Sequence, residues 1–330
     1  MKSKLLAIFL SGSMAPMALA DPEFHFDDLQ RFGEALEAIE TGADPLASVE
    51  NYFNNGSPAL HGFAGRYQTT AESITEELLE RPIYYGTLPS LEQYVREREG
   101  PISSALERLQ DMAPAGQLAP VYFMVADQRA GGTPVMAQGD DGPFIAIAVA
   151  VDVIAVSPDT DMSEFPNGTG GRARVEDLPQ VAVHENAHVL QLASQGGLGN
   201  YRSIYSPDTG SMLAVAVREG CAEYLTYLAS GWRLGDRHVY GEANEQALWS
   251  AFQEIADEPP FSVPGWFGGS HPEHADWPSQ IGYWVGFRIC EHHHANADDP
   301  DAALADLFTL YSPEDVQPLA EAYGAALARR

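Results

Sequence analysis

Lysine is nearly absent from this chain. The two lysines, Lys2 and Lys4, stand at the amino terminus, and every other basic residue is an arginine. Acidic residues predominate, so the formal net charge is −29 at pH 7. Nucleic acids and anionic membranes attract basic surfaces, and this charge balance argues strongly against both as partners. Adaptation to salty surroundings and a GC-rich coding bias explain the arginine usage equally well, since net charge informs on solubility rather than fold.

Long apolar runs are also missing. The run Leu5–Leu10 is too short to span a membrane, and no later segment holds about 18 uninterrupted apolar residues. This run follows the two lysines and precedes small residues that end in Ala18-Leu19-Ala20, which is typical of a signal peptide. We therefore predict a signal peptide over residues 1–20 and an exported protein without a membrane span, periplasmic or extracellular. Loss of both lysines would change the net charge to −29 − 2 = −31.

Cysteine is scarce, with Cys221 and Cys290 as the two examples. In an oxidising compartment they could form a disulfide between two late helices. Buried free thiols are common in protein cores, and the sequence slightly favours that alternative. Neither cysteine is expected to bind a catalytic metal, because thiolates would suggest a closed structural zinc site.

Helical and extended patterns divide the chain. Apolar residues recur at helical spacing over 24–39, 45–53, 71–79 and 88–112, which predicts an N-terminal helical lobe over residues 21–115.

The pattern becomes β-rich at Val121–Val125 and at 143–156, with a turn at 128–133 between them. This predicts a small mixed or antiparallel sheet, whose edge could bind a peptide by strand addition. Residues 116–330 are expected to form one domain that contains this sheet and the later helices. The predicted fold class is α+β and mostly helical.

A His-Glu-x-x-His motif occupies residues 184–188, in a segment with helix signals from Asp177 to Gly196. Residues four apart lie on one face of a helix, so His184 and His188 can bind a single metal ion. Glu185 lies beside that face, where a carboxylate can take the proton of a metal-bound water. Such a short motif also arises by chance, so a third ligand is needed to support the interpretation.

A second predicted helix, Ser211–Ser230, supplies candidates for the third ligand. Glu219 and Glu223 are four residues apart on it and share a face. A buried pair of carboxylates is costly unless a cation or hydrogen-bond donors meet it. Glu219 is the expected ligand, and a solvated acidic face is the alternative. His271 and His274, in a Gly-, Pro- and aromatic-rich segment that could contact substrate, are further candidates.

The motif, followed by Glu219-Gly-x-Ala-Glu223, resembles the gluzincin metallopeptidases. Residues 120–290 are similar to bacterial predicted zinc-dependent proteases of unknown substrate. This resemblance implies a zincin-like active-site helix, one Zn²⁺ bound by His184, His188 and Glu219, and Glu223 orienting a ligand histidine.

A Gly-Tyr element of the related proteases is similar to Gly282-Tyr283. The resemblance implies that the Tyr283 hydroxyl donates to the oxyanion of a tetrahedral intermediate, and packing with a hydrogen-bonded tip is the alternative. The chain departs from the family in two respects. Asn186 makes the motif more polar than usual, and the Gly-x-Met-Glu-Asn element of aminopeptidases is missing.

Together these patterns predict a secreted or periplasmic zinc metallopeptidase that acts on peptides or proteins. Glu185 would activate a zinc-bound water and pass its proton to the leaving amine. One alternative is an exported binding or adaptor protein that keeps a protease-like fold without catalysis. Another is a zinc hydrolase of a non-peptide bond. The intact Glu185 counts against the adaptor, because a structural metal site needs no base.

Overall fold

The computed structural model describes residues 22–154, 156–165, 174–233, 235–269, 271–310 and 312–330. The predicted signal peptide, residues 1–20, lies outside the described residues. The fold is mostly helical with one four-stranded sheet, which confirms the predicted α+β class. No helix among the described residues is both long enough and apolar enough to cross a membrane.

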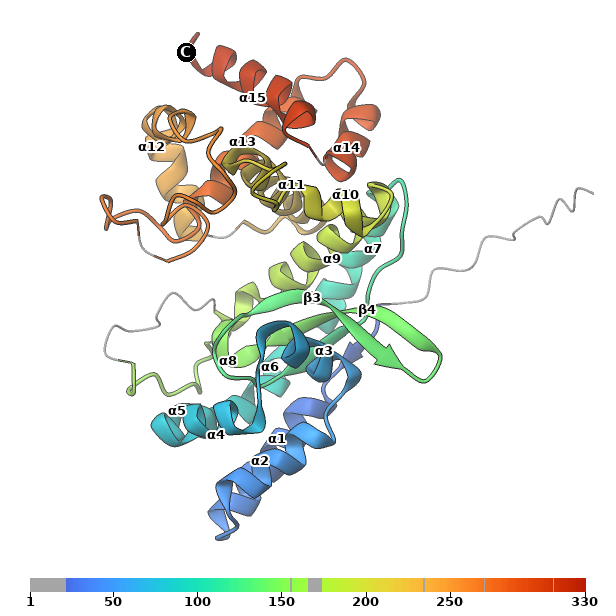
Figure 1. Cartoon of the computed structure of the whole chain (residues 1–330), viewed down its shortest axis with the longest axis vertical. Coiled ribbons are helices and arrows are strands. Elements are labelled where there is room, and N and C mark those ends of the chain that lie inside the picture. The colour runs from blue at the N-terminus through green and yellow to red at the C-terminus, as the bar shows by residue number, and fades with distance from the viewer. Residues whose placement is uncertain (1–21, 155, 166–173, 234, 270, 311) are drawn as a thin grey trace, which may run out of the picture.

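The helices of the N-terminal part lie mostly at the bottom of Figure 1, and the last of them runs up towards the later helices. They are α1 (Asp27–Glu40), α2 (Pro45–Asn54), α3 (Pro58–Tyr67), α4 (Ala71–Glu80), α5 (Pro82–Thr87), α6 (Leu91–Arg96) and α7 (Glu99–Met112). Side chains of Asp44, Ser57 and Thr70 cap α2, α3 and α4, as their residue types favour. The sequence pattern did not predict α3 and α5.

The sheet is mixed, as predicted, with the order β1-β2-β4-β3. Its strands are β1 (Phe24–His25), β2 (Val121–Met124), β3 (Gly132–Gly139) and β4 (Gly142–Ala150). The pairs β1–β2 and β2–β4 are parallel, whereas β3 pairs antiparallel with β4. The first strand therefore comes from the beginning of the described chain and lies beside a strand almost a hundred positions later.

Two details of the predicted sheet were wrong. The turn expected over 128–133 runs into β3, which was not predicted, because Pro134 interrupts its pattern. Proline is tolerated there since β3 is an edge strand. The β-rich segment ends at Ala150, and α8 (Val151–Ile154) follows it. Buried Asp152 stabilises this change of direction by accepting hydrogen bonds from the backbone N–H of Ala126 (2.8 Å) and Gln128 (2.9 Å).

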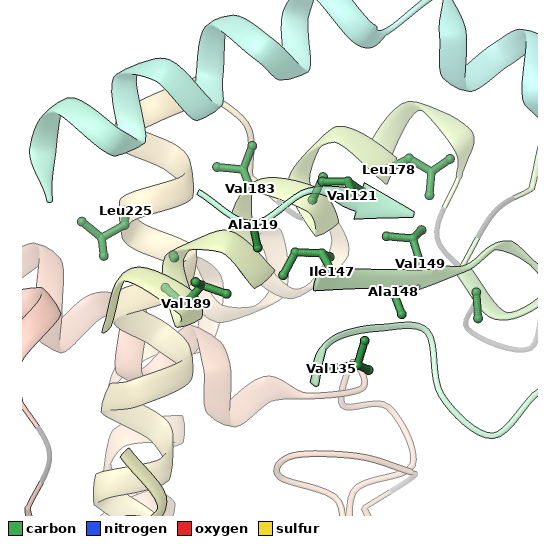
Figure 2. Packing of buried hydrophobic residues seen from close by; sticks show 14 of the residues in the cluster. Ala119, Val121, Val135, Ile147, Ala148, Val149, Leu178, Val183, Val189 and Leu225 are labelled. Carbon is green, nitrogen blue, oxygen red and sulfur yellow. The ribbon is translucent and has the colours of Figure 1, made fainter. Parts of the chain in front are cut away.

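The remaining helices form the upper part of Figure 1, and α9 runs from the sheet towards them. They are α9 (Leu178–Ser194), α10 (Leu198–Ser203), α11 (Met212–Ser230), α12 (Gly235–Gln253), α13 (Ile281–Ala295), α14 (Pro300–Thr309) and α15 (Pro313–Leu327). Figure 2 shows side chains of the sheet, such as Val121 and Ile147, packed with Val183 of α9. The hydrophobic core thus extends from the sheet to α9, which packs against the sheet and against the helix α11.

The helices α11 and α13 approach each other closely enough to touch through their backbones. An added Cβ at Gly220 would lie 2.1 Å from the carbonyl carbon of Gly286. Immediately after this contact a disulfide joins Cys221 to Cys290, whose Cα atoms are 5.4 Å apart. The preference for free thiols was therefore wrong, because the sequence does not reveal that two glycines bring these helices together.

A single methyl group at this crossing should destabilise the protein. An added Cβ at Gly286 would lie 1.7 Å from the carbonyl oxygen of Ala216, so Gly286→Ala is expected to lower the free energy of unfolding by about 3 kcal/mol. Gly65→Ala in α3 is the matched control, because nothing lies within 4 Å of its added Cβ. That variant should gain about 0.5–1 kcal/mol. Urea unfolding measures both, and equal stabilities would contradict the described crossing.

Candidate metal centre

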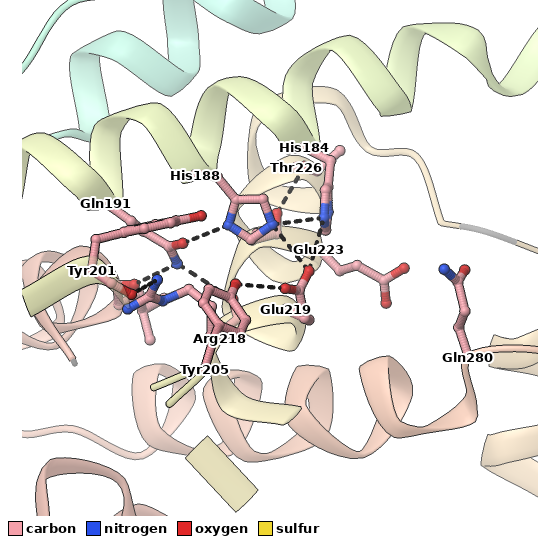
Figure 3. A network of polar contacts seen from close by, with 12 residues as sticks. His184, His188, Gln191, Tyr201, Tyr205, Arg218, Glu219, Glu223, Thr226 and Gln280 are labelled. Carbon is pink, nitrogen blue, oxygen red and sulfur yellow. Dashed lines mark hydrogen bonds and ion pairs between the residues drawn. The ribbon is translucent and has the colours of Figure 1, made fainter. Parts of the chain in front are cut away.

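The motif helix α9 presents both histidines towards α11, as Figure 3 shows. The Nε2 atoms of His184 and His188 are 3.1 Å apart. Between them in sequence, Asn186 is fully buried and points to the other side, where its Oδ1 accepts the backbone N–H of Ala119 (2.8 Å). The unusual polar residue of the motif therefore binds the helix to the segment that enters β2.

Glu219 of α11 completes a group of three potential ligands. Its Oε2 lies 3.0 Å from His188 Nε2 and 3.5 Å from His184 Nε2. Within the described part of the chain, these three residues are the group of histidine, cysteine and carboxylate side chains able to hold a metal ion, with ligand atoms within 4.8 Å of one another. The structure thus brings together the three residues that were predicted as ligands from the sequence.

The protonation of His188 shows why a cation fits here. Gln191 Nε2 donates to the carbonyls of Leu307 (3.2 Å) and Arg218 (3.5 Å), so its Oε1 faces His188 Nδ1 at 2.9 Å. His188 must then carry its proton on Nδ1, and its Nε2 lone pair faces Glu219. Lone pairs from three side chains converge on one point, which suits the N and O ligands that zinc prefers.

Without a cation, a proton takes its place. Burial would lower the pKa of His188, but Tyr201 and then Glu219 outweigh it and raise this pKa to about 10. Burial would likewise raise the pKa of Glu219, but His188 and His184 lower it well below its usual value. Metal binding must therefore displace the shared proton.

Sequence reasoning missed two residues that support the ligands. Gln191 is three residues after His188, a helical spacing that could have indicated it. Tyr205 lies in the connection between α10 and α11, where no local signal marks it, and its hydroxyl donates to Glu219 Oε1 at 2.8 Å. Such partners fix the direction of a ligand and are typically worth about 10–100-fold in metal affinity.

Glu223 does not have the contact that was expected for it. Its Oε1 accepts a hydrogen bond from Arg237, and its Oε2 is buried without a hydrogen-bond partner among the described residues. Arg237 also donates to Gln280 Oε1 at 2.9 Å. Glu223 was expected to orient a ligand histidine. For His188, Gln191 makes that contact instead. The reason is that α12 places a buried guanidinium beside Glu223, which the sequence does not reveal.

His238, which follows Arg237, is expected to make the free energy of unfolding depend on pH. His238 is 5 % exposed, and burial, followed by the charges of Arg237 and Arg233, lowers its pKa to about 3. The unfolded chain binds this proton below about pH 6.5, and the folded chain does not. The free energy of unfolding should therefore fall by about 1.4 kcal/mol for each pH unit below 6.5.

His238→Phe should remove this part of the slope, measured as urea unfolding at pH 5 and pH 7. Exposed His61→Phe is the control and should leave the slope unchanged. Identical slopes in the parent and the His238 variant would contradict a buried neutral histidine.

Glu185 lies next to the start of the edge strand. A Cβ added at Gly132 would meet Val181 at 2.4 Å and Glu185 Oε1 at 3.3 Å, so glycine allows β3 to approach α9 here. Burial raises the pKa of Glu185, while His184 and then His188 oppose the shift. Its carboxylate has no hydrogen bond to another described side chain, so it can accept one from water. A carboxylate with a raised pKa is well suited to take a proton near neutral pH.

Tyr283, in the first turn of α13, contacts the ring of His184. Their rings are parallel with centroids 6.0 Å apart, and the Arg237 guanidinium lies 5.1 Å from the Tyr283 ring. Burial and then Glu219 raise the pKa of Tyr283 well above its usual value. The hydroxyl therefore stays protonated and can act as a hydrogen-bond donor.

The two alternative ligands lie elsewhere. His274 stacks on Trp277 with ring centroids 4.1 Å apart, and His271 contacts the same indole at 4.6 Å. Neither belongs to the group of converging ligand atoms. These histidines instead help to pack the loop between α12 and α13.

No protein-family model, curated protein or solved structure matches this chain. Two imidazoles and one carboxylate form a ligand set typical of zinc hydrolases that keep a position for water. The side chains of Glu185 and Tyr283 are neighbours of that set, Glu185 as the residue after His184 in α9 and Tyr283 through the contact of its ring with His184.

Proposed function

We propose that this chain is an exported zinc-dependent metallopeptidase. The observation that carries the proposal is the convergence of His184, His188 and Glu219, with the carboxylate of Glu185 beside them. The disulfide Cys221–Cys290 supports export, because such bonds persist in oxidising compartments. The sheet before α9 and the ligand histidines on α9 support a zincin-like arrangement.

Zinc bound by the three ligands would supply a Lewis acid that polarises a carbonyl and acidifies water. Glu185 takes the proton of the attacking water and transfers it to the leaving amine, as general base and then general acid. The Tyr283 hydroxyl donates a hydrogen bond to the substrate oxygen that becomes negatively charged, where a fixed donor is most effective. Tyr205 and Gln191 hold Glu219 and His188 in position.

The decisive experiment combines metal content with peptide cleavage. The mature protein is purified, its zinc content is measured, and a mixed peptide library is digested and read by mass spectrometry. We expect about one zinc per chain, cleavage of library peptides, loss of cleavage with a chelator and recovery with added zinc. A protein that binds zinc but cleaves no peptide would favour the adaptor or a hydrolase of another bond. A protein that binds no zinc would overturn the proposal.

A further inference from the structure

In the edge strand β3, the main-chain N–H and C=O groups of every second residue point away from β4, towards the open edge of the sheet. The N–H of Ala150 donates to the carbonyl of Gly131 (3.1 Å), so Gly131 faces β4. In the antiparallel register the N–H and C=O groups alternate between the partner strand and the open edge. Gly132, Pro134, Met136 and Gln138 therefore present their main-chain groups outwards.

The middle of this outward edge is not free to bind a peptide. Pro134 has no N–H, and its carbonyl accepts a hydrogen bond from Arg66 of α3 (3.0 Å). The Met136 carbonyl lies against Gly62, where an added Cβ would be 2.6 Å away. The open edge is therefore interrupted in the middle of the strand, at Pro134 and Met136. Continuous main-chain pairing with a substrate strand is therefore not available here, and side-chain contacts can provide selectivity instead.

Seven aromatic side chains form a closed circuit of rings through both ligand histidines. Neighbouring rings in the circuit have centroids between 4.7 and 6.3 Å apart. The circuit consists of His184, His188, Tyr201, Tyr205, Phe261, Phe267 and Tyr283. Aromatic faces of this kind bind apolar side chains by packing and by ring contacts.

Phe261 is the exposed member of this circuit. Its side chain is 54 % exposed, and its backbone has φ = 58°, in the left-handed region that favours glycine. A bulky residue in that conformation is costly, and such conformations gather at functional sites. An exposed phenyl ring adds nothing to the core that would offset the cost. Both observations indicate that the ring serves a purpose at the surface.

Tyr205 connects Phe261 directly to the metal ligands. Its hydroxyl donates to Glu219, and its ring is parallel to that of Phe261 with centroids 5.9 Å apart. Phe267 meets Phe261 edge-on at 5.7 Å. A substrate side chain that packs on the Phe261 ring is separated from Glu219 by the ring of Tyr205. The peptide bond next to that side chain would then lie at the metal centre.

The loop that carries Phe261 is held in place. Trp266 is 2 % exposed, and its carbonyl accepts the N–H of Gly282 (2.9 Å), next to Tyr283. The rings are therefore arranged before any ligand binds, which reduces the entropy lost on binding.

We propose that Phe261, with Tyr205 and Phe267, forms the subsite for an aromatic or large aliphatic side chain next to the bond that is cleaved. This inference rests on the proposed metallopeptidase function. It names the substrate class as peptides with a large apolar residue beside the scissile bond.

The test uses two metal-binding probes that differ in one side chain. Phenylalanine hydroxamate and alanine hydroxamate are titrated into the zinc-loaded protein, its Phe261→Gly variant and its Phe261→Leu variant. The parent should bind the phenylalanine probe about tenfold more tightly than the alanine probe, and Phe261→Gly should reduce the ratio to about one. Phe261→Leu should keep part of the preference. Leu79→Ala, which removes a similarly exposed apolar side chain from α4, should leave both affinities unchanged.

Thermal unfolding separates a binding role from a structural one. Glycine is favoured at φ = 58°, so Phe261→Gly should unfold at the same temperature as the parent or higher. Equal affinity of the parent for both probes, or an unchanged ratio in Phe261→Gly, would overturn the subsite while leaving the metal centre intact. A protein that binds neither zinc nor the probes would overturn both proposals. Peptide cleavage is not needed for any of these outcomes.

Discussion

Glu185→Gln is expected to lower the rate of peptide hydrolysis by about 10²–10⁴-fold while the zinc content stays at the parental level. The amide has nearly the shape of the carboxylate, so packing against Gly132 is preserved. It cannot accept a proton from water, and the general base is lost. Glu185 does not belong to the converging ligand atoms, so metal binding should survive.

The measurements are kcat with the best library peptide and the zinc content of the same sample. Glu176→Gln is the matched control, because it removes an exposed carboxylate just before α9. It should retain parental activity. Full activity of Glu185→Gln would refute the assigned role. Loss of activity together with loss of zinc would show that Glu185 maintains the metal site rather than acting as the base.

Glu219→Ala should lose at least about a hundredfold in zinc affinity, because it removes one of three protein ligands and the negative charge that favours the cation. Titration of the apoprotein with zinc against a chelator of known affinity measures this loss. Glu223→Gln is the matched comparison, since it lies one turn later on α11 and pairs with Arg237. It should bind zinc within about tenfold of the parent.

Zinc binding that survives in Glu219→Ala would contradict the three-ligand centre. Zinc binding that fails only in Glu223→Gln would exchange the roles of the two carboxylates. Tyr205→Phe should be intermediate, with a loss of about tenfold, because Glu219 keeps its charge but loses its hydrogen bond.

The α+β class and the two helices of the metal centre could be predicted because they depend on local patterns. The segment 178–194 has proline in its first turn and a Gly-Gly pair after its end, and Ser211 caps α11. The strand β3 could not be recognised, because Pro134 is acceptable only where the outward N–H is unnecessary, and that depends on the order of the strands.

The candidate ligands could be named from the sequence, since histidines four residues apart on a helix share a face whatever surrounds them. Their surroundings could not. Tyr205 and Arg237 come from segments with no motif, and only the packing of α10 and α12 brings them to Glu219 and Glu223. Phe261 was part of an aromatic loop in the sequence, and its exposure became evident only in three dimensions.

By itself, the sequence determined the candidate chemistry of this protein: a pair of histidines on one helical face, a carboxylate beside them and a strongly acidic composition. The tertiary structure decided which carboxylate meets the histidines, which one pairs with an arginine, and that Cys221 and Cys290 are joined. The physical reason is the range of the interactions. Helical periodicity acts over a few residues, whereas the approach of α11 to α13 depends on glycine contacts between segments far apart in the chain.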